Sequence, residues 1–355
     1  MAENKRCIYL DSLRIFSALA VICIHTSVQI FFGADNSPAA LVGSSAWCAA
    51  AVYDALSRFC VPMFLMISGA LFLGKRLSIK RIYGKYILRI LTAYVFWSFL
   101  YALLRDIRVY SIVFWTIRGG PRFSFLCYII GLYMLVPLLD RFVCEPRYMS
   151  YFLILCFFFG FLEPQLYDIA SVEQIRYIST LYPDVHEFFI NMRLSEMTWL
   201  PAYFVLGYAL FHYDIKPKYR RVLYCHGLLG AAATVCGTVW SSLRANALIQ
   251  YWFSYRSVNV LFMTVGMFVF AKYECSKISL CPALERALSR VAELTFCVFL
   301  VHSWVLDTFL LDMGITAYCA PAWISIPVIV LLAFVISLCI AFGAKKIPVL
   351  NRYIT

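Results

Sequence analysis

Two titratable side chains, Arg14 and His25, lie in one long apolar stretch near the N-terminus. The eleven steps between them correspond to about 1100° of α-helical rotation, close to three full turns, so both lie on one face of a helix predicted over residues 9–32. The rise between them is about 16 Å, which places His25 near the middle of a bilayer and Arg14 near the cytoplasmic surface. An imidazole at that depth suits a general base that takes a proton from a hydroxyl nucleophile.

The same pattern also fits a purely structural interpretation. In that interpretation His25 hydrogen-bonds a neighbouring helix, while Arg14 extends to the lipid surface and pairs with Asp11. Ionisable groups inside a membrane span are costly and are functional suspects by default. The shared helix face therefore favours the functional interpretation.

A basic segment over residues 74–89 has the composition of a phosphate-binding rim. Arg and Lys clusters at a cavity mouth suit phosphate groups. Coenzyme A fits, because its nucleotide can stay at the rim while its uncharged pantetheine arm carries a thioester inward past the small side chains of Ala18 and Val21. The cluster also fits ordinary positive-inside topology and attraction to anionic lipid headgroups. Its six cations, without an acidic residue among them, are Lys75, Arg76, Lys80, Arg81, Lys85 and Arg89.

The elements that must position these side chains are membrane-spanning helices. Only 14% of the 355 residues are charged and 63% are hydrophobic by a count that includes tyrosine, whereas about 25% of a soluble domain is charged. With a mean hydropathy of +0.79, this composition excludes a soluble globular enzyme, a disordered chain and a nucleic-acid-binding module. A span needs about 20 mostly apolar residues. The sequence therefore predicts an all-α integral membrane bundle of about ten transmembrane helices, near residues 9–32, 56–73, 86–104, 122–139, 148–163, 197–212, 222–241, 257–273, 291–311 and 322–344.

The placement of the cations predicts the topology. Most of the 31 Lys and Arg residues fall in cytoplasmic segments if the N-terminus is cytoplasmic, and an even number of spans then makes the C-terminus cytoplasmic as well. We expect one multi-pass domain, residues 1–355, in the cytoplasmic (inner) membrane. Its longest outer connection, about residues 163–196, is expected to lie partly ordered over the mouth of the bundle. The 14 cysteines include no CxxC pair and no His spacing suited to zinc, so no metal site is expected.

Several sequence blocks resemble those of the acyltransferase-3 family of integral membrane acyltransferases. Arg14 and His25, which follow Leu10-Asp11-Ser12-Leu13, resemble its signature of an Arg and a His separated by ten residues. The blocks keep the family order from residue 10 to residue 350. Those that follow the signature are Arg58-Phe-Cys-Val-Pro62-Met-Phe-Leu-Met-Ile-Ser68-Gly69, Gly131-Leu-Tyr133-Met-Leu-Val-Pro137, Tyr203-Phe-Val-Leu-Gly207-Tyr, Val298-Phe-Leu-Val-His302 and Lys345-Lys-Ile-Pro348.

The resemblance implies a ten-helix membrane domain that transfers an acyl group, most often acetyl, from cytosolic acyl-CoA to a hydroxyl of a cell-envelope glycan or lipid-linked sugar. It implies that Arg14 and His25 are needed for activity. Acyl-CoA is then a co-substrate, no cofactor is bound permanently, and no hydrolase-like domain is appended. Two blocks depart from the family pattern: its Arg-x-x-Arg appears as Lys85-Tyr-Ile-Leu-Arg89, and its His-Leu-Trp as Ser124-Phe125-Leu126.

These observations predict an O-acyltransferase with His25 as general base and with Arg14 placed to hold a donor phosphate or to orient the helix face that carries His25. Lys85 and Arg89 are expected to hold the donor nucleotide. The expected partners are acyl-CoA, an envelope glycan or lipid-linked saccharide, and membrane lipid, with no nucleic acid; the sequence specifies no oligomeric state. A covalent acyl-His intermediate is a second form of the same mechanism.

Three further residues are candidate acceptor-binding or supporting groups: Asp11, Arg58 and His302. Arg58 either forms a structural i,i+4 pair with Asp54 or contacts the acceptor. His302, in a span with Glu293 and Asp307, is expected to hydrogen-bond rather than to catalyse. Aromatic residues such as Tyr133 are expected to pack or to face lipid.

A different class of protein also fits the buried polar residues. In a proton-coupled transporter or flippase, His25, His302 and Glu293 would form a proton or substrate path. The sequence shows neither the paired broken helices nor the internal repeats typical of such transporters. A membrane sensor or scaffold that has lost the reaction is a third possibility, against which the presence of Arg14 and His25 argues.

Overall fold

The computed structural model describes residues 7–33, 39–104, 123–173 and 178–347, and this part of the chain forms helices and connecting turns without a strand. The prediction of an all-α integral membrane bundle is thereby confirmed. Both termini, predicted to be cytoplasmic, and residue 348 of the last family block lie outside the described residues.

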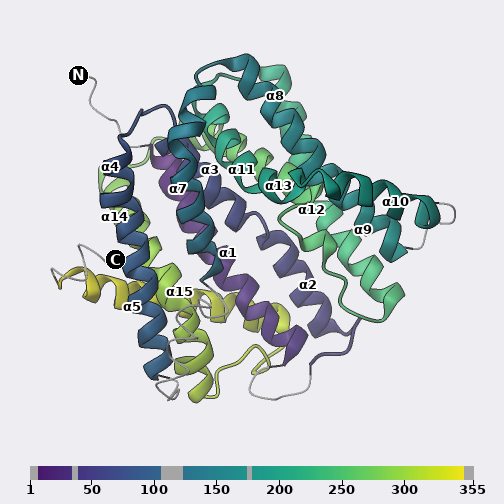
Figure 1. Ribbon diagram of the computed structural model, residues 1–355. Coiled ribbons are helices and arrows are strands. Elements are labelled where there is room, and N and C mark those ends of the chain that lie inside the picture. Colours follow the sequence, from purple (N-terminus) through teal and green to yellow (C-terminus); the bar gives the residue numbers. More distant parts are fainter. Residues whose placement is uncertain (1–6, 34–38, 105–122, 174–177, 348–355) are drawn as a thin grey trace.

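Helix α1 (Ile8–Phe32) runs through the middle of the bundle (Figure 1). It packs against α2 (Ser45–Ser57), α3 (Cys60–Phe72), α14 (Pro282–Trp304) and α15 (Ala322–Lys345). Both Ala18 and Val21, on the face between Arg14 and His25, are buried. The helix that carries the signature residues is thus surrounded by protein rather than by lipid.

Helices α2 and α3 form one span that breaks at Arg58 and Phe59. Pro62 explains the break, because its nitrogen carries no hydrogen for the carbonyl of Arg58 and its ring crowds that carbonyl. The predicted span over residues 56–73 therefore covers only the second half of the helical segment Ser45–Phe72.

The remaining helices complete the bundle. Three π-helical segments interrupt them: Ile82–Ile87 before α5, Phe158–Leu162 between α8 and α9, and Val305–Leu310 after α14. Such turns frequently mark functional sites. The helices are α4 (Ile79–Arg81), α5 (Leu88–Leu104), α7 (Ser124–Phe142), α8 (Pro146–Phe157), α9 (Glu163–Glu173), α10 (Ile178–Asn191), α11 (Leu194–His212), α12 (Pro217–Ala245) and α13 (Val258–Tyr273), with short turns at Tyr251–Phe253 and Cys275–Lys277.

Nine helical segments among the described residues are long and apolar enough to cross a membrane. Each corresponds to one predicted span. The predicted span 197–212 forms α11, which is not among the nine and is an interior helix, buried over most of residues 201–210. The nine segments are Ile8–Phe32, Ser45–Phe72, Ile79–Leu104, Ser124–Phe142, Pro146–Glu173, Pro217–Ala245, Tyr251–Lys277, Pro282–Leu310 and Ala322–Lys345.

Glycines allow α11 to pack directly on α3. A Cβ atom on Gly69 would lie 1.7 Å from the carbonyl oxygen of Phe204, and one on Gly207 would lie 2.0 Å from that of Met66. Only glycine permits such close contact between the two backbones, and small residues at helix crossings are typical of membrane proteins.

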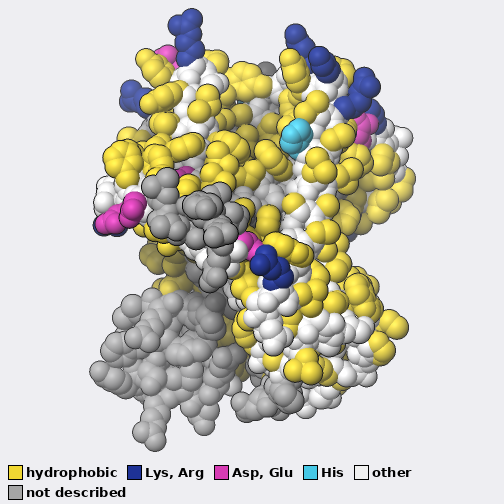
Figure 2. All heavy atoms as spheres, turned by 90° about the vertical axis from the view of Figure 1, so that its right-hand side faces the viewer, with side chains coloured by type: hydrophobic (Ala, Val, Ile, Leu, Met, Phe, Trp, Pro, Cys, Tyr) yellow, Lys and Arg dark blue, Asp and Glu magenta, His cyan; other side chains and the backbone are white. Residues whose placement is uncertain are grey.

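The connection predicted over residues 163–196 is more helical than expected. Its first part continues the fifth predicted span, because the segment Pro146–Glu173 is helical throughout. Its second part forms α10, which packs on α9. Figure 2 views the side of the molecule on which these helices lie, where Lys and Arg side chains gather along one end above a broad hydrophobic surface.

Candidate active site

Helices α1 and α14 bring His25 and His302 together. The two imidazole rings stack with their centroids 5.3 Å apart and their planes at 29°. His302 is buried, whereas His25 is half-buried. The sequence predicted His302 only as a supporting group, and nothing in its spacing from His25 indicated that the two rings would touch.

Two hydrogen bonds orient the ring of His302. Its Nδ1 lies 2.6 Å from the carbonyl oxygen of Phe299, which can only accept, so Nδ1 carries the proton. Its Nε2 lies 3.3 Å from the hydroxyl of Ser303. The ring of His302 is therefore held in a defined orientation, and His25 rests against it.

Tyr101 of α5 inserts its hydroxyl into the backbone of α14 beside this pair. The backbone N–H of Trp304 donates to the hydroxyl at 2.9 Å, and the hydroxyl donates to the carbonyl of Leu300 at 2.8 Å. In a regular α-helix that N–H would bond directly to that carbonyl. The inserted hydroxyl thus interrupts the helix one turn after Leu300, directly before the π-helical segment Val305–Leu310.

Asp11 links Arg14 to α14. Its carboxylate accepts from Arg14 Nη1 at 3.3 Å and from the hydroxyl of Ser289 at 3.0 Å, and Asp11 itself is buried. The predicted pairing of Arg14 with Asp11 is therefore present. Burial and the charge of Asp11 raise the pKa of the nearby Cys7 thiol, which keeps it protonated and a poor nucleophile at neutral pH.

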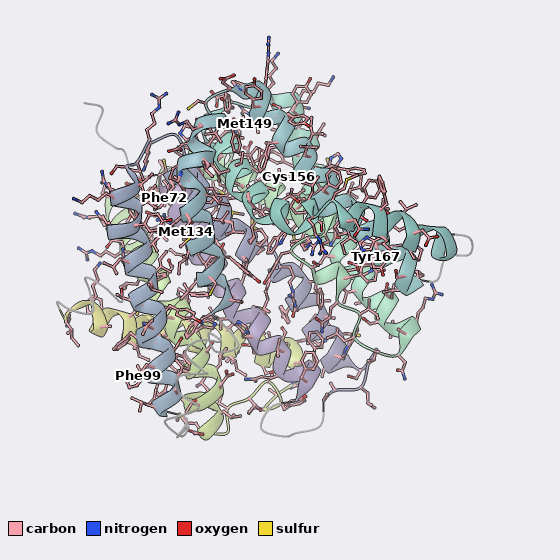
Figure 3. All side chains as sticks on the ribbon, viewed as in Figure 1. Phe72, Phe99, Met134, Met149, Cys156 and Tyr167 are labelled. Carbon is pink, nitrogen blue, oxygen red and sulfur yellow. The ribbon has the colours of Figure 1, made fainter. Side chains whose placement is uncertain are left out.

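Arg14 and Arg89 converge on Tyr133. The charges of both guanidinium groups act on the Tyr133 hydroxyl, which also interacts with Ser68. The ring of Phe72 stacks on that of Tyr133 with centroids 4.3 Å apart, and Figure 3 labels Phe72 on this side of the bundle. Tyr133 is thus buried and packed, as expected, but the sequence did not indicate that two cations would lie near its hydroxyl.

Lys85 takes a different position from Arg89. It lies in the π-helical segment Ile82–Ile87, is exposed, and places its ammonium group 5.7 Å from the ring centroid of Tyr86. Arg89, also exposed, lies over the ring of Phe296 on α14 at 5.8 Å. Of the two predicted donor-binding cations, only Arg89 thus approaches the Arg14 side of the bundle.

Arg58 forms the structural pair that the sequence allowed. Two of its nitrogens, Nε and Nη2, donate to the carboxylate of Asp54, which is fully buried, and its guanidinium carbon lies 4.6 Å from the ring centroid of Phe253. The negative charge of Asp54 is felt at Cys23. Cys23 points about 200° away from His25 around α1. Arg58 therefore belongs to the break between α2 and α3 and not to the histidine pair.

Glu293 does not extend the histidine pair. Its carboxylate bonds to Lys345 at 2.7 Å. The nine steps from Glu293 to His302 correspond to about 900° of rotation, so the two side chains lie on opposite faces of α14. The described residues contain no group of three or more His, Cys, Asp and Glu side chains that could hold a metal ion.

The arrangement places the imidazole of His25 beside the fixed ring of His302, with Arg14 on α1 and Arg89 on α5 as nearby cations. Such a site can remove a proton from a hydroxyl and hold an anionic ligand. A comparison with protein-family models matches residues 8–344 to an acyltransferase domain, that of the acyltransferase-3 family. No curated protein and no solved structure matches the chain.

Proposed function

The chain belongs to the acyltransferase-3 family of membrane acyltransferases, and on that premise we propose that it is an O-acyltransferase of the cytoplasmic membrane. It moves an acyl group, most simply acetyl, from cytosolic acyl-CoA to a hydroxyl of a cell-envelope glycan or lipid-linked sugar. The stacking of His25 on His302 is the observation that supports this proposal most strongly.

In the proposed reaction His25 acts as general base. The acceptor oxygen attacks the thioester carbonyl while His25 takes the hydroxyl proton; the carbon–sulfur bond then breaks, and the proton passes to the departing thiolate of CoA. His302 is a positioning residue, because its ring, fixed by Phe299 and Ser303, limits how His25 can turn.

The donor is proposed to enter from the end of the bundle that carries Arg14 and Arg89. The positive charges of both guanidinium groups reach the Tyr133 hydroxyl, and arginine is well suited to binding phosphate groups. The rise from Arg14 to His25, about 16 Å along α1, matches the length over which the pantetheine arm must carry the thioester.

The test is acyl transfer by the purified full chain in detergent. Labelled acyl-CoA is supplied with the lipid and glycan fractions of cells that carry the gene. We expect His25→Ala to lose transfer by at least about 100-fold, the usual contribution of a general base, while acyl-CoA binding largely survives.

His212→Ala is the matched control, because His212 lies at the end of α11 and bonds the backbone of its own helix. It should retain transfer. Unchanged turnover in His25→Ala would disprove the mechanism. Because detergent abolishes any gradient, transfer under these conditions also excludes a transporter as the sole function.

A further inference from the structure

A cavity of about 240 Å³, lined in part by polar side chains, lies among α9, α10 and the turn that precedes α13. Its walls include Tyr167 and Asp168 of α9, His186 of α10, and Ser254 and Arg256 of the turn. Figure 3 labels Tyr167 on the side of the bundle where α9 and α10 meet, away from α5 and α7. None of these residues belongs to the candidate active site.

The walls of this cavity are well fixed. The rings of Tyr167 and His186 stack with centroids 3.6 Å apart and planes at 14°. His186 Nδ1 also bonds to the Glu163 carboxylate at 2.6 Å, which holds α10 on α9. The positive charge of Arg256 attracts the carboxylate of Asp168. Because the charges are opposed, the cavity offers donors and acceptors suited to hydroxyl groups rather than to a strongly anionic group.

An apolar groove of about 410 Å³ adjoins the cavity. It runs between α9 and α12, with Leu166 from the first helix, Leu229 and Ala233 from the second, and Phe262 of α13. Leu166 is 44% exposed and Leu229 is 65% exposed. All three helices belong to candidate membrane spans, so the groove opens toward the hydrocarbon of the bilayer.

One side chain forms the boundary between the two compartments. Gln165 lines both, while Ser257 lines the cavity and its neighbour Val258 lines the groove. The side chain of Gln165 accepts from the Val258 N–H at 2.7 Å and donates to Asn259 at 2.8 Å. The boundary is therefore rigid, and a ligand can place one part on each side of it.

We propose that the two compartments together bind a lipid-linked saccharide, with the sugar in the cavity and the hydrocarbon chain in the groove. A phospholipid headgroup would leave the hydroxyl-binding groups of the cavity largely unused, and a soluble glycan would leave the groove unused. This inference concerns binding alone; it rests on the proposed function only in suggesting that such a lipid is the acyl acceptor.

Retention of lipids by the purified full chain tests the proposal. The probe is the total lipid extract of cells that carry the gene, used intact or after mild acid has cleaved sugars from their lipids, and bound species are identified by mass spectrometry. We expect the parent protein to retain sugar-bearing lipids from the intact extract, and neither free sugar nor bare lipid to the same extent from the hydrolysed one.

Two pairs of variants examine the two compartments. Ala233→Phe fills the groove, whereas Ala232→Phe adds the same ring to the exposed neighbouring position. Asp168→Asn alters the cavity, whereas Asp184→Asn makes the same change at an exposed site on α10. We expect the first member of each pair to retain about fivefold less glycolipid, the effect of losing roughly one buried contact, and the second member to match the parent.

Retention of phospholipids alone, equal retention within both pairs, or equal retention of free and lipid-linked sugar would each overturn the proposal. His25→Ala separates it from the proposed function, because this variant should bind glycolipid normally. If the parent protein binds glycolipid but transfers no acyl group, the proposed function is disproved and the proposed binding site is retained. If it transfers an acyl group but does not bind glycolipid selectively, the binding site is disproved and the proposed function is retained.

Discussion

At the scale of single residues, the charged side chains along α1, α2 and α5 divide into two kinds. Asp54 and Arg58 satisfy each other at the break between α2 and α3, whereas Arg14 and Arg89 act on a common hydroxyl, that of Tyr133. The first pair stabilises a fold, and the second arrangement is suited to an anionic ligand. Sequence spacing alone predicts the pairing of Asp54 with Arg58 but gives no sign of Tyr133.

Removing one member of the buried pair should destabilise the protein. Asp54→Ala leaves the Arg58 guanidinium without its carboxylate in a buried site, and such losses cost about 3–5 kcal/mol. Thermal unfolding in detergent, followed by size-exclusion chromatography, should show a clearly lower midpoint. Asp184→Ala, on an exposed part of α10, should leave the midpoint unchanged; equal midpoints for the two variants would contradict a structural role for Asp54.

The two candidate donor-binding residues, Arg89 and Lys85, should differ in how much they contribute to binding acyl-CoA. Arg89→Ala should raise the KM for acyl-CoA about 3- to 10-fold, since up to about 1.4 kcal/mol of phosphate binding is lost, with kcat at saturation little changed. Lys85→Ala should raise KM less than about twofold, because that ammonium lies in solvent beside Tyr86. Steady-state kinetics with varied acyl-CoA distinguishes the two, and equal effects would refute the assignment of the rim to Arg14 and Arg89.

At the scale of helices, tertiary contacts override what periodicity predicts. The break at residues 58 and 59 follows from Pro62 and could be foreseen from local rules. The interruption of α14 could not, because it depends on a hydroxyl from α5, some 200 residues away in the sequence. The sequence therefore predicts the existence of most helices, while their irregular turns and the His25–His302 contact require the assembled bundle.

Tyr101→Phe tests whether this interruption positions the pair of His25 and His302. Without the hydroxyl, Trp304 can bond directly to Leu300, which turns His302 relative to His25. We expect kcat to fall about tenfold, equivalent to about 1.4 kcal/mol, with KM for acyl-CoA unchanged. Tyr151→Phe, at an exposed site on α8, should have no effect, and a parallel rise in KM for Tyr101→Phe would indicate general damage instead of lost positioning.

The crossing of α3 and α11 should tolerate no added methyl group. Gly207→Ala places a carbon against the carbonyl of Met66, and overpacking of this kind costs about 1–3 kcal/mol or more. We expect a lower unfolding midpoint and less monodisperse protein. Gly131→Ala has no atom within 4 Å of the added carbon, so it should be neutral or slightly stabilising, because alanine favours helix.

At the scale of the whole molecule, composition determines the fold class but not every crossing. The apolar content predicts ten spans, and nine segments meet that description. The other, α11, runs alongside α13: Ser195 and Ser257 line one cavity at their beginnings, and Lys272 of α13 donates to the carbonyls of Leu210, Phe211 and Tyr213 at the end of α11. Apolar content predicts this helix as a span but not its interior position, because an aromatic-rich helix surrounded by protein resembles in composition one that faces lipid.

We therefore expect α11 to be a tenth crossing, which places both termini on the cytoplasmic side. Fusions of green fluorescent protein and alkaline phosphatase to the C-terminus should give fluorescence and no phosphatase activity. Fusions after Arg193 and after Tyr213, at the two ends of α11, should report opposite sides. The same side for both would reduce the count to nine and reverse the C-terminus.

One continuous helix carries both Arg89 and Tyr101. Helix α5 spans Leu88–Leu104, so the cation proposed to meet the donor and the hydroxyl that is wedged into α14 are about 18 Å apart on a single stiff rod. Any displacement of this rod at Arg89 would therefore also reach the turn that sets the angle of His302. Through this one helix, we expect binding of the donor and alignment of the histidine rings to influence each other.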